Sequence, residues 1–142
     1  MQPSAELRSS GDLLAIAGRH SYAVPGACVL GIQRLRDWQG DTPLDVLPLL
    51  GIEAAEPDTD TARVALLDVG AWCLPLLVCG AVSLIRPAPG ELLALPTAMQ
   101  SLAPLVSHIA VVNGKPSLFV LSPARLAHAH AAVPPVLPLA SR

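Results

Sequence analysis

Charged and aromatic residues are scarce in this sequence of 142 residues, at 14% and 3% of the chain, whereas hydrophobic residues make up 52%. The formal net charge is −2 and Lys115 is the only lysine, so the chain lacks the basic surface that nucleic-acid binding requires. The high hydrophobic fraction and the small net charge exclude an intrinsically disordered chain.

Paired cysteines and targeting segments are also lacking. Cys28, Cys73 and Cys79 form no CxxC motif, and an odd number of cysteines suits a reducing compartment. The apolar run Leu13–Ala17 is too short for the core of a signal peptide. The sequence therefore predicts a cytoplasmic protein.

The segment Val69–Ile85 has no charged residue and is about as long as the shortest membrane span. It contains Gly70, Pro75 and Gly80, however, and Asp68 precedes it in place of a positive flank. Two buried strands separated by turn residues account for it equally well, and we favour that interpretation over membrane insertion.

What the chain does have is 15 prolines and 10 glycines, which cut it into short apolar segments. Interior prolines disfavour a helical bundle, and short strands at this spacing are typical of a sandwich or barrel. The sequence predicts an all-β domain with short helices. The segments are Leu13–Gly18, Ser21–Pro25, Cys28–Leu35, Thr42–Leu50, Arg63–Val69, Cys73–Ile85, Val106–Val112 and Ser117–Leu121.

Two turns and two helices follow from local chemistry. Asn113-Gly114 suits a type I′ turn, so the segments ending at Val112 and starting at Ser117 should form a hairpin. Asp68–Trp72 predicts a second turn. A short helix is expected near Asp45–Leu50. Another should begin with Ser122 as its N-cap and Pro123 in its first turn, and continue through Ala124–Ala132 until Pro134 and Pro135 stop it.

Catalytic and metal-binding motifs are absent: GxGxxG, GxxxxGK(S/T), GxSxG and HExxH do not occur. His128 and His130 lie two residues apart on the predicted helix and cannot chelate one metal together. Asp58 and Asp60 lack the glycine and the glutamate that a calcium loop needs. We expect no enzyme activity, no cofactor and no metal. One alternative is a nucleophilic cysteine paired with His108, which needs an exposed, electropositive thiol.

Three blocks of the sequence occur in the order seen in a known family. Residues 29–51, from Val29-Leu30-Gly31-Ile32 through Pro43-Leu44 to Leu49-Leu50-Gly51, resemble the CheW-like pattern VxGVxNLRG followed by IPVxDLxxLLG. The stretch ARVALLDVGAWCLPLLVCGAVSLIRP is similar to the family's paired strands. LVSHIAVVNGKPSLFVLSPARL is similar to its closing hairpin and helix. Together the blocks cover residues 29–126.

The resemblance implies a pair of small SH3-like β-barrels in one CheW-like domain over residues 11–133, with tails at 1–10 and 134–142. It also implies a non-catalytic adaptor that couples chemoreceptors to a CheA-like histidine kinase. The implied partners are the kinase regulatory domain and a receptor tip or another CheW-like domain. The Asp-Trp-Gln-Gly stretch at 37–40 is closer to CheW-like proteins of pilus-type (twitching) chemosensory systems.

The sequence departs from the family at VPGAC, where the predicted strand Ser21–Pro25 is joined almost directly to Val29; the family has a further strand or helix at this place. Whether the first barrel is complete therefore stays open. An open sheet edge would also suit a self-associating module or a degenerate homologue without kinase coupling, which is the alternative hypothesis.

The candidate partner-binding residues are Arg36, Arg34, Leu30 and Ile32. Arg36 matches the arginine of the family motif, and Arg34 should share its strand face. The competing interpretation of both arginines is a solvated charge that protects an edge strand. Leu30 and Ile32 alternate with Val29 and Gly31, so one pair should face the core and the other should form an apolar contact patch.

Overall fold

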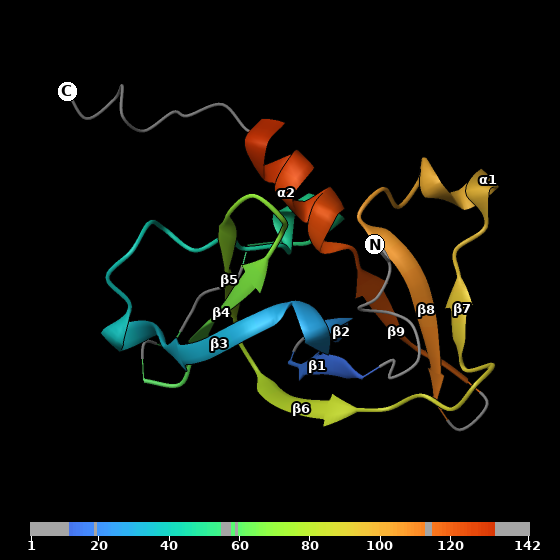
Figure 1. Ribbon diagram of the computed structural model, residues 1–142, viewed down its shortest axis with the longest axis horizontal. Helices are drawn as coiled ribbons and strands as arrows, with labels where there is room; N and C mark the ends of the chain where they lie inside the picture. Colours follow the sequence, from blue (N-terminus) through green and yellow to red (C-terminus); the bar gives the residue numbers. More distant parts are fainter. Residues whose placement is uncertain (1–11, 19, 55–57, 59, 113–114, 133–142) are drawn as a thin grey trace.

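The computed structural model describes residues 12–18, 20–54, 58, 60–112 and 115–132. In that part of the chain, strands form two sheets (Figure 1). The larger sheet has the strand order β6-β1-β2-β9-β8-β7, in which β2 and β9 are parallel and the other neighbours antiparallel. Its strands are β1 Leu13–Ala17, β2 Tyr22–Pro25, β6 Ala81–Ile85, β7 Leu92–Ala94, β8 Val106–Val112 and β9 Lys115–Leu121.

The smaller sheet is antiparallel, with the order β3-β4-β5. It consists of β3 Val29–Arg34, β4 Arg63–Asp68 and β5 Cys73–Val78. Leu44 forms an isolated bridge to Leu76 of β5. Figure 1 shows β3 in front of β4 and β5, whereas β6 runs along the lower edge of the molecule.

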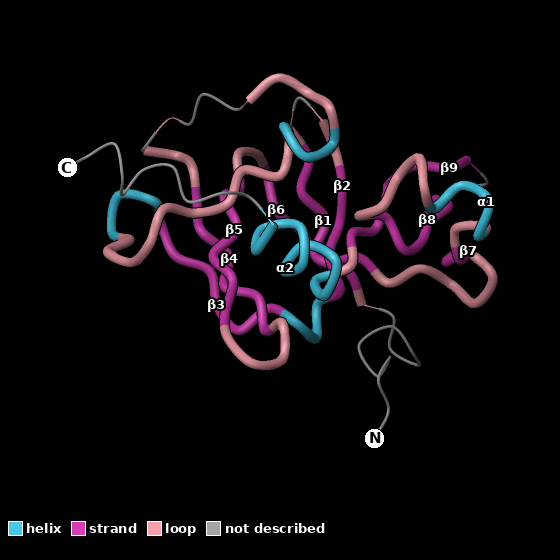
Figure 2. The backbone as a smooth tube through the Cα atoms, turned by 90° about the horizontal axis from the view of Figure 1, so that it is seen from above, coloured by secondary structure: helices cyan, strands magenta, loops and turns pink. Residues whose placement is uncertain are grey.

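Helix α2, Pro123–Ala132, lies between the smaller sheet and the β7–β9 end of the larger one (Figure 2). Its start is the predicted one. The Ser122 hydroxyl accepts a hydrogen bond from the Arg125 amide at 3.3 Å, and the Ser122 carbonyl accepts one from the Leu126 amide at 2.9 Å. Pro134 and Pro135, which were expected to stop this helix, lie outside the described residues, as do both predicted tails.

The two predicted β-hairpins are confirmed. β8 pairs with β9, although Asn113-Gly114 of their turn lies outside the described residues. β4 pairs with β5, and Asp68 Oδ1 accepts a hydrogen bond from the Gly70 amide at 2.9 Å, where Gly70 has a φ of 109°. A carboxylate that bonds two residues ahead and a glycine that takes a positive φ are what this turn needs.

Two predictions need correction, and two elements were missed. The helix expected near Asp45–Leu50 is only a 3₁₀ turn, Pro48–Leu50, because the Asp45 side chain accepts the Leu47 amide and Gly51 turns left-handed at a φ of 80°. Strand β7 and the four-residue helix α1, Thr97–Gln100, were not predicted. The segment Cys73–Ile85 does form two strands, but β6 is not buried, because it lies at the sheet edge and leaves Leu84 69% exposed.

The larger hydrophobic core cluster of the described residues joins the two sheets. It takes buried side chains from β1 and β2 of the larger sheet, from β4 and β5 of the smaller one, and from α2. Leu14, Val24, Leu67, Leu76 and Leu126 are representative, each at most 5% exposed. A second, smaller cluster lies on the other face of the larger sheet and consists of Leu13, Ala23, Ala110 and Val120.

Gly18 and Gly80 allow the chain to pass from the smaller sheet to the larger one between β5 and β6. A Cβ on Gly18 would lie 2.5 Å from the Cys79 carbonyl oxygen, and one on Gly80 would lie 2.6 Å from that of Ala17. Real Cβ atoms do not approach backbone so closely, so the crossing needs glycine at both positions.

Among the described residues, no helix is both long and apolar enough to cross a membrane.

The shared core predicts the effect of Leu76→Ala on stability. Leu76 is fully buried in β5, so its truncation should lower the free energy of unfolding by about 3 kcal/mol. Leu102→Ala is the control, because Leu102 is 82% exposed and its truncation should change stability by less than about 0.5 kcal/mol. Urea unfolding measures both. Equal losses for the two variants would contradict the assigned core.

Candidate partner-binding groove

An apolar groove of about 550 Å³ lies between β3 and β6, each of which is an edge strand of its sheet. We call it the β3–β6 groove. Its larger side chains come from β1, β3 and β6 and are Leu14, Val29, Leu30, Ile32, Val82 and Leu84; Gly26, Gly31 and Ser83 complete its lining. A groove of this size, lined by aliphatic side chains, fits a partner side chain or a short extended segment.

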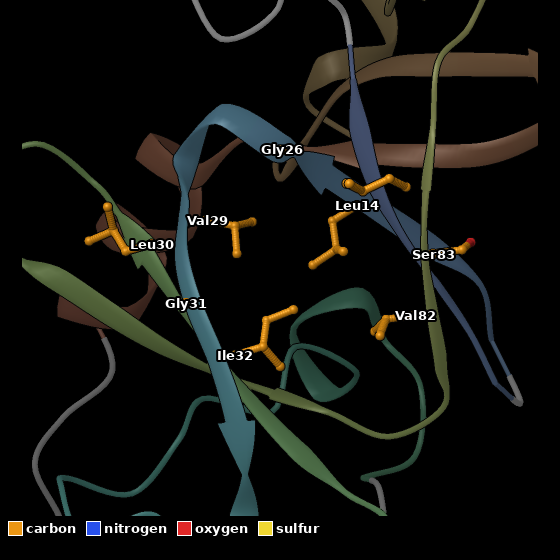
Figure 3. A pocket seen from close by; sticks show the side chains of 9 residues that line it. Leu14, Gly26, Val29, Leu30, Gly31, Ile32, Val82 and Ser83 are labelled. Carbon is orange, nitrogen blue, oxygen red and sulfur yellow. The ribbon is translucent and has the colours of Figure 1, made fainter.

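A β-bulge shapes the β3 wall of the groove. Val29 is opposite Leu67 and Gly31 is opposite Leu66, so Leu30 is the extra residue in β3. Figure 3 shows Val29 and Ile32 directed toward Leu14 and Val82, whereas the Leu30 side chain points to the other side of β3. The bulge thereby brings Val29 and Ile32 to the same side of the strand although they lie three residues apart.

Because of the bulge, the predicted apolar patch of Leu30 and Ile32 on β3 needs correction. Val29 packs against the core, and Leu30 and Ile32 are 57% and 40% exposed. Leu30 and Ile32 both line the groove, but their side chains point to opposite sides of β3, because the extra residue breaks the two-residue repeat between them (Figure 3).

The prediction that Arg34 and Arg36 share a strand face is wrong. β3 ends at Arg34, and Leu35–Asp37 form a 3₁₀ turn that the Trp38 amide closes on the Leu35 carbonyl at 3.0 Å. Arg36 lies on this turn, 3.7 Å from Asp60, with 53% of its side chain exposed. Arg34 lies 3.9 Å from Asp37, with 63% of its side chain exposed. Both ion pairs are at the surface and contribute little to stability.

Arg34 has a basic neighbour that the sequence did not reveal. It is directly opposite Arg63 of β4, and both line a depression that begins at Ile32, where the β3–β6 groove ends. Like charges directly opposite each other in a sheet repel. Asp37 lines the same depression, so this end of the groove has two guanidinium groups and one carboxylate.

At the other end of the groove, a positive and a negative side chain form an ion pair. Arg86 donates to Asp12 through Nε at 2.6 Å and through Nη2 at 3.0 Å. The hydrogen bond from Arg86 lowers the pKa of the Asp12 carboxyl below its usual value. The Asp12 carbonyl accepts the amide of Gly26, which lines the groove, so this pair lies beside the groove. Among the described groups at the two ends of the groove, the excess positive charge therefore lies at the Arg34–Arg63 end.

Sequence analysis missed Leu14, Val82 and Leu84 as groove residues, and it missed Arg63 in the adjoining depression. They are far from β3 in the chain, and only strand pairing and the packing of the sheets bring them together.

The residues considered for catalysis lie apart from this groove. Cys79 follows β5, whereas His108 is on β8 of the other sheet, where its Nδ1 lies 2.9 Å from the Ser107 hydroxyl. Burial raises the pKa of the Cys79 thiol, with Asp45 adding to the shift, whereas burial and Arg125 lower the pKa of His108. A raised thiol pKa is the opposite of what a cysteine nucleophile needs.

The remaining histidines and acidic residues do not gather into a ligand set. The His130 ring lies 5.8 Å from the Trp72 ring, whereas His128 lines a separate depression with Arg125. Asp58 Oδ1 accepts the Asp60 amide at 2.9 Å, a local turn. Within the described part of the chain, no group of three or more histidine, cysteine, aspartate or glutamate residues is placed to hold a metal ion.

The arrangement of the two sheets is that of the CheW-like all-β fold. The crystal structure of the scaffolding protein TtCheW from Thermoanaerobacter tengcongensis aligns with 78% of this chain and 86% of its own, with a TM-score of 0.56 and 16% sequence identity. At this identity the likeness establishes the fold, as the sequence resemblance predicted. No family model matches the sequence, and no curated protein matches it.

The thiol environments predict slow alkylation of Cys79. Its raised pKa leaves little thiolate at neutral pH, so iodoacetamide should modify the exposed Cys73 before the half-buried Cys79. Peptide mass spectrometry of a time course at pH 7 measures the two rates. Faster modification of Cys79 than of Cys73 would revive the cysteine-nucleophile hypothesis.

Proposed function

We propose that this protein is a non-catalytic adaptor that couples chemoreceptors to a CheA-like histidine kinase in a bacterial chemosensory system. The observation that carries the proposal is the CheW-like fold shared with a solved scaffolding protein. The β3–β6 groove supports it, because exposed leucine and isoleucine side chains beside arginines form a surface suited to a protein partner.

The adaptor would act by rigid placement. The shared core fixes the two sheets against each other, so partners bound at different edges are held in a defined arrangement. Kinase output then shifts by the difference in free energy with which these contacts stabilise the kinase's alternative states. This mechanism needs no acid, base or nucleophile in the adaptor.

The proposed partners are the regulatory domain of the kinase and a receptor tip or another CheW-like domain, in the cytoplasm. The Asp37-Trp38-Gln39-Gly40 stretch supports a pilus-type system. In the structure Trp38 Nε1 donates to the Asp41 carbonyl at 2.6 Å, which orders this stretch next to Arg36.

Self-association without kinase coupling is the second candidate. The observation that favours it is the pair of open edges, since β3 has only β4 as a partner and β6 only β1 among the described residues. Light scattering during size-exclusion chromatography distinguishes the two. A stable dimer that does not bind kinase would support self-association.

The proposed function predicts how two substitutions change binding to the kinase. Leu30→Asp should raise the dissociation constant for the kinase regulatory domain about tenfold or more, because it places a charge in an apolar contact. Arg36→Glu should raise it about fivefold through a charge at the rim. Isothermal titration calorimetry with the purified full chain measures both.

Leu102→Asp is the matched control, since it makes the same change at a leucine that does not line the groove. Its dissociation constant should stay within about twofold of the unmodified protein. No binding of the folded protein at high micromolar concentration would contradict kinase coupling. An unchanged affinity for Arg36→Glu would remove Arg36 from the interface.

A further inference from the structure

The outer edge of β3 offers backbone groups that no described strand uses. Its register with β4 is regular from Gly31 to Arg34, after the bulge. The Leu35 amide donates to the Ala62 carbonyl at 2.9 Å, on the β4 side. Because hydrogen-bonded and non-hydrogen-bonded pairs alternate in an antiparallel ladder, Gln33 also bonds toward β4, and the N–H and C=O groups of Ile32 and Arg34 point outward.

Space for an added strand exists along this edge. The β3–β6 groove lies beside it, and Gly31 and Ile32 of this edge are among the residues that line the groove. Ile32 is directed into the groove toward Val82 (Figure 3). An apolar side chain on an added strand would therefore be covered by Val29, Ile32 and Val82, aliphatic residues that are only partly buried in the free chain.

The two arginines at the end of this edge indicate which side chain an added strand should carry beside them. Arg34 and Arg63 form a non-hydrogen-bonded pair, the kind in which opposite side chains are closest. Among the described residues, only the carboxylate of Asp37 lies within 4 Å of either guanidinium group. It is 3.9 Å from that of Arg34. A carboxylate placed between the two arginines would relieve their repulsion and could accept hydrogen bonds from both.

We propose that the β3 edge accepts an extended segment of a partner protein as an additional strand, with an apolar side chain in the β3–β6 groove and a carboxylate between Arg34 and Arg63. This deepens the proposed function by naming the kind of segment that the adaptor recognises, and it rests on that function only in taking the partner to be a protein. The main-chain pairing supplies affinity, and the two side chains supply specificity.

A second copy of the chain fits this edge less well. β6, the other open edge of the groove, is uncharged, and β3 itself has arginine as its only charged residue. Neither strand, donated by another copy, would bring a carboxylate to the arginine pair. Charge complementarity therefore favours a partner segment in which aspartate or glutamate follows an apolar residue at the two-residue spacing of one strand face.

The test uses seven-residue peptides of alternating valine and threonine, capped at both ends, with glutamate, glutamine or lysine at one valine position near an end. Each is titrated into the 15N-labelled full chain and followed by amide chemical shifts. The proposal predicts the largest shifts at the outward amides of Ile32 and Arg34. It also predicts that the glutamate peptide binds about fivefold more tightly than the lysine peptide.

Two pairs of variants separate the side-chain and backbone contributions. Arg34→Glu should reverse the preference so that the lysine peptide binds more tightly, whereas Leu102→Asp should leave it unchanged. Ile32→Pro should weaken binding more than Ile32→Ala, because proline removes an outward N–H that β4 does not use. If Ile32→Pro does not fold, the proposal is still tested by whether Arg34→Glu reverses the preference between the glutamate and lysine peptides.

The proposal is overturned by shifts confined to other strands, by equal affinities for the glutamate and lysine peptides, or by no binding at millimolar peptide. Concentration-dependent shifts of Ile32 and Arg34 without peptide would also overturn it, because they would show that a second copy occupies the edge. None of these experiments contains a kinase. A failure of kinase binding would therefore count against the proposed function alone, and a failure of peptide binding would count against the added-strand proposal alone.

Discussion

The two sheets are held at a fixed separation by the hydrophobic core that they share, and the rest of the structure depends on this packing. Leu14 of β1, Leu76 of β5 and Leu126 of α2 belong to one cluster, so neither sheet can move without exposing buried side chains. The close crossing at Gly18 and Gly80 ties the smaller sheet to the larger one through the backbone as well. The consequence is that β3 and β6 face each other across a groove that the core does not fill.

Local chemistry made the hairpins and the start of α2 predictable, because Asp68, Gly70, Ser122 and Pro123 act on neighbours a few residues away. The ordered motif blocks predicted the CheW-like fold, which the likeness to TtCheW confirms. The groove could not be predicted in the same way. It depends on a bulge in β3, on the pairing of β6 with β1, and on the position of Arg63 opposite Arg34, which are consequences of register rather than of local sequence.

The short connection after β2 links the sequence to the proposed function. A 3₁₀ turn, Gly26–Cys28, is all that separates β2 from β3, at the place where the family pattern contains a further strand or helix. Among the described residues, the edge of β3 away from β4 is free, with an apolar groove on one side and a pair of arginines at its end. Natural edge strands are protected by charges and bulges. Here the bulge blocks pairing at Leu30 but leaves the stretch from Gly31 to Arg34 regular, so the protection is incomplete where the arginines lie.

Amide hydrogen exchange along β3 tests most directly whether this edge is open and accepts a partner. In the free protein, NMR-detected exchange should be at least about tenfold slower for Gln33 and Leu35, which bond to β4, than for Ile32 and Arg34, which point outward. Addition of the kinase regulatory domain or the receptor tip, whichever binds β3, should then slow Ile32 and Arg34. Equal protection of all four amides in the dilute free protein, or no added protection with either partner bound, would contradict the account.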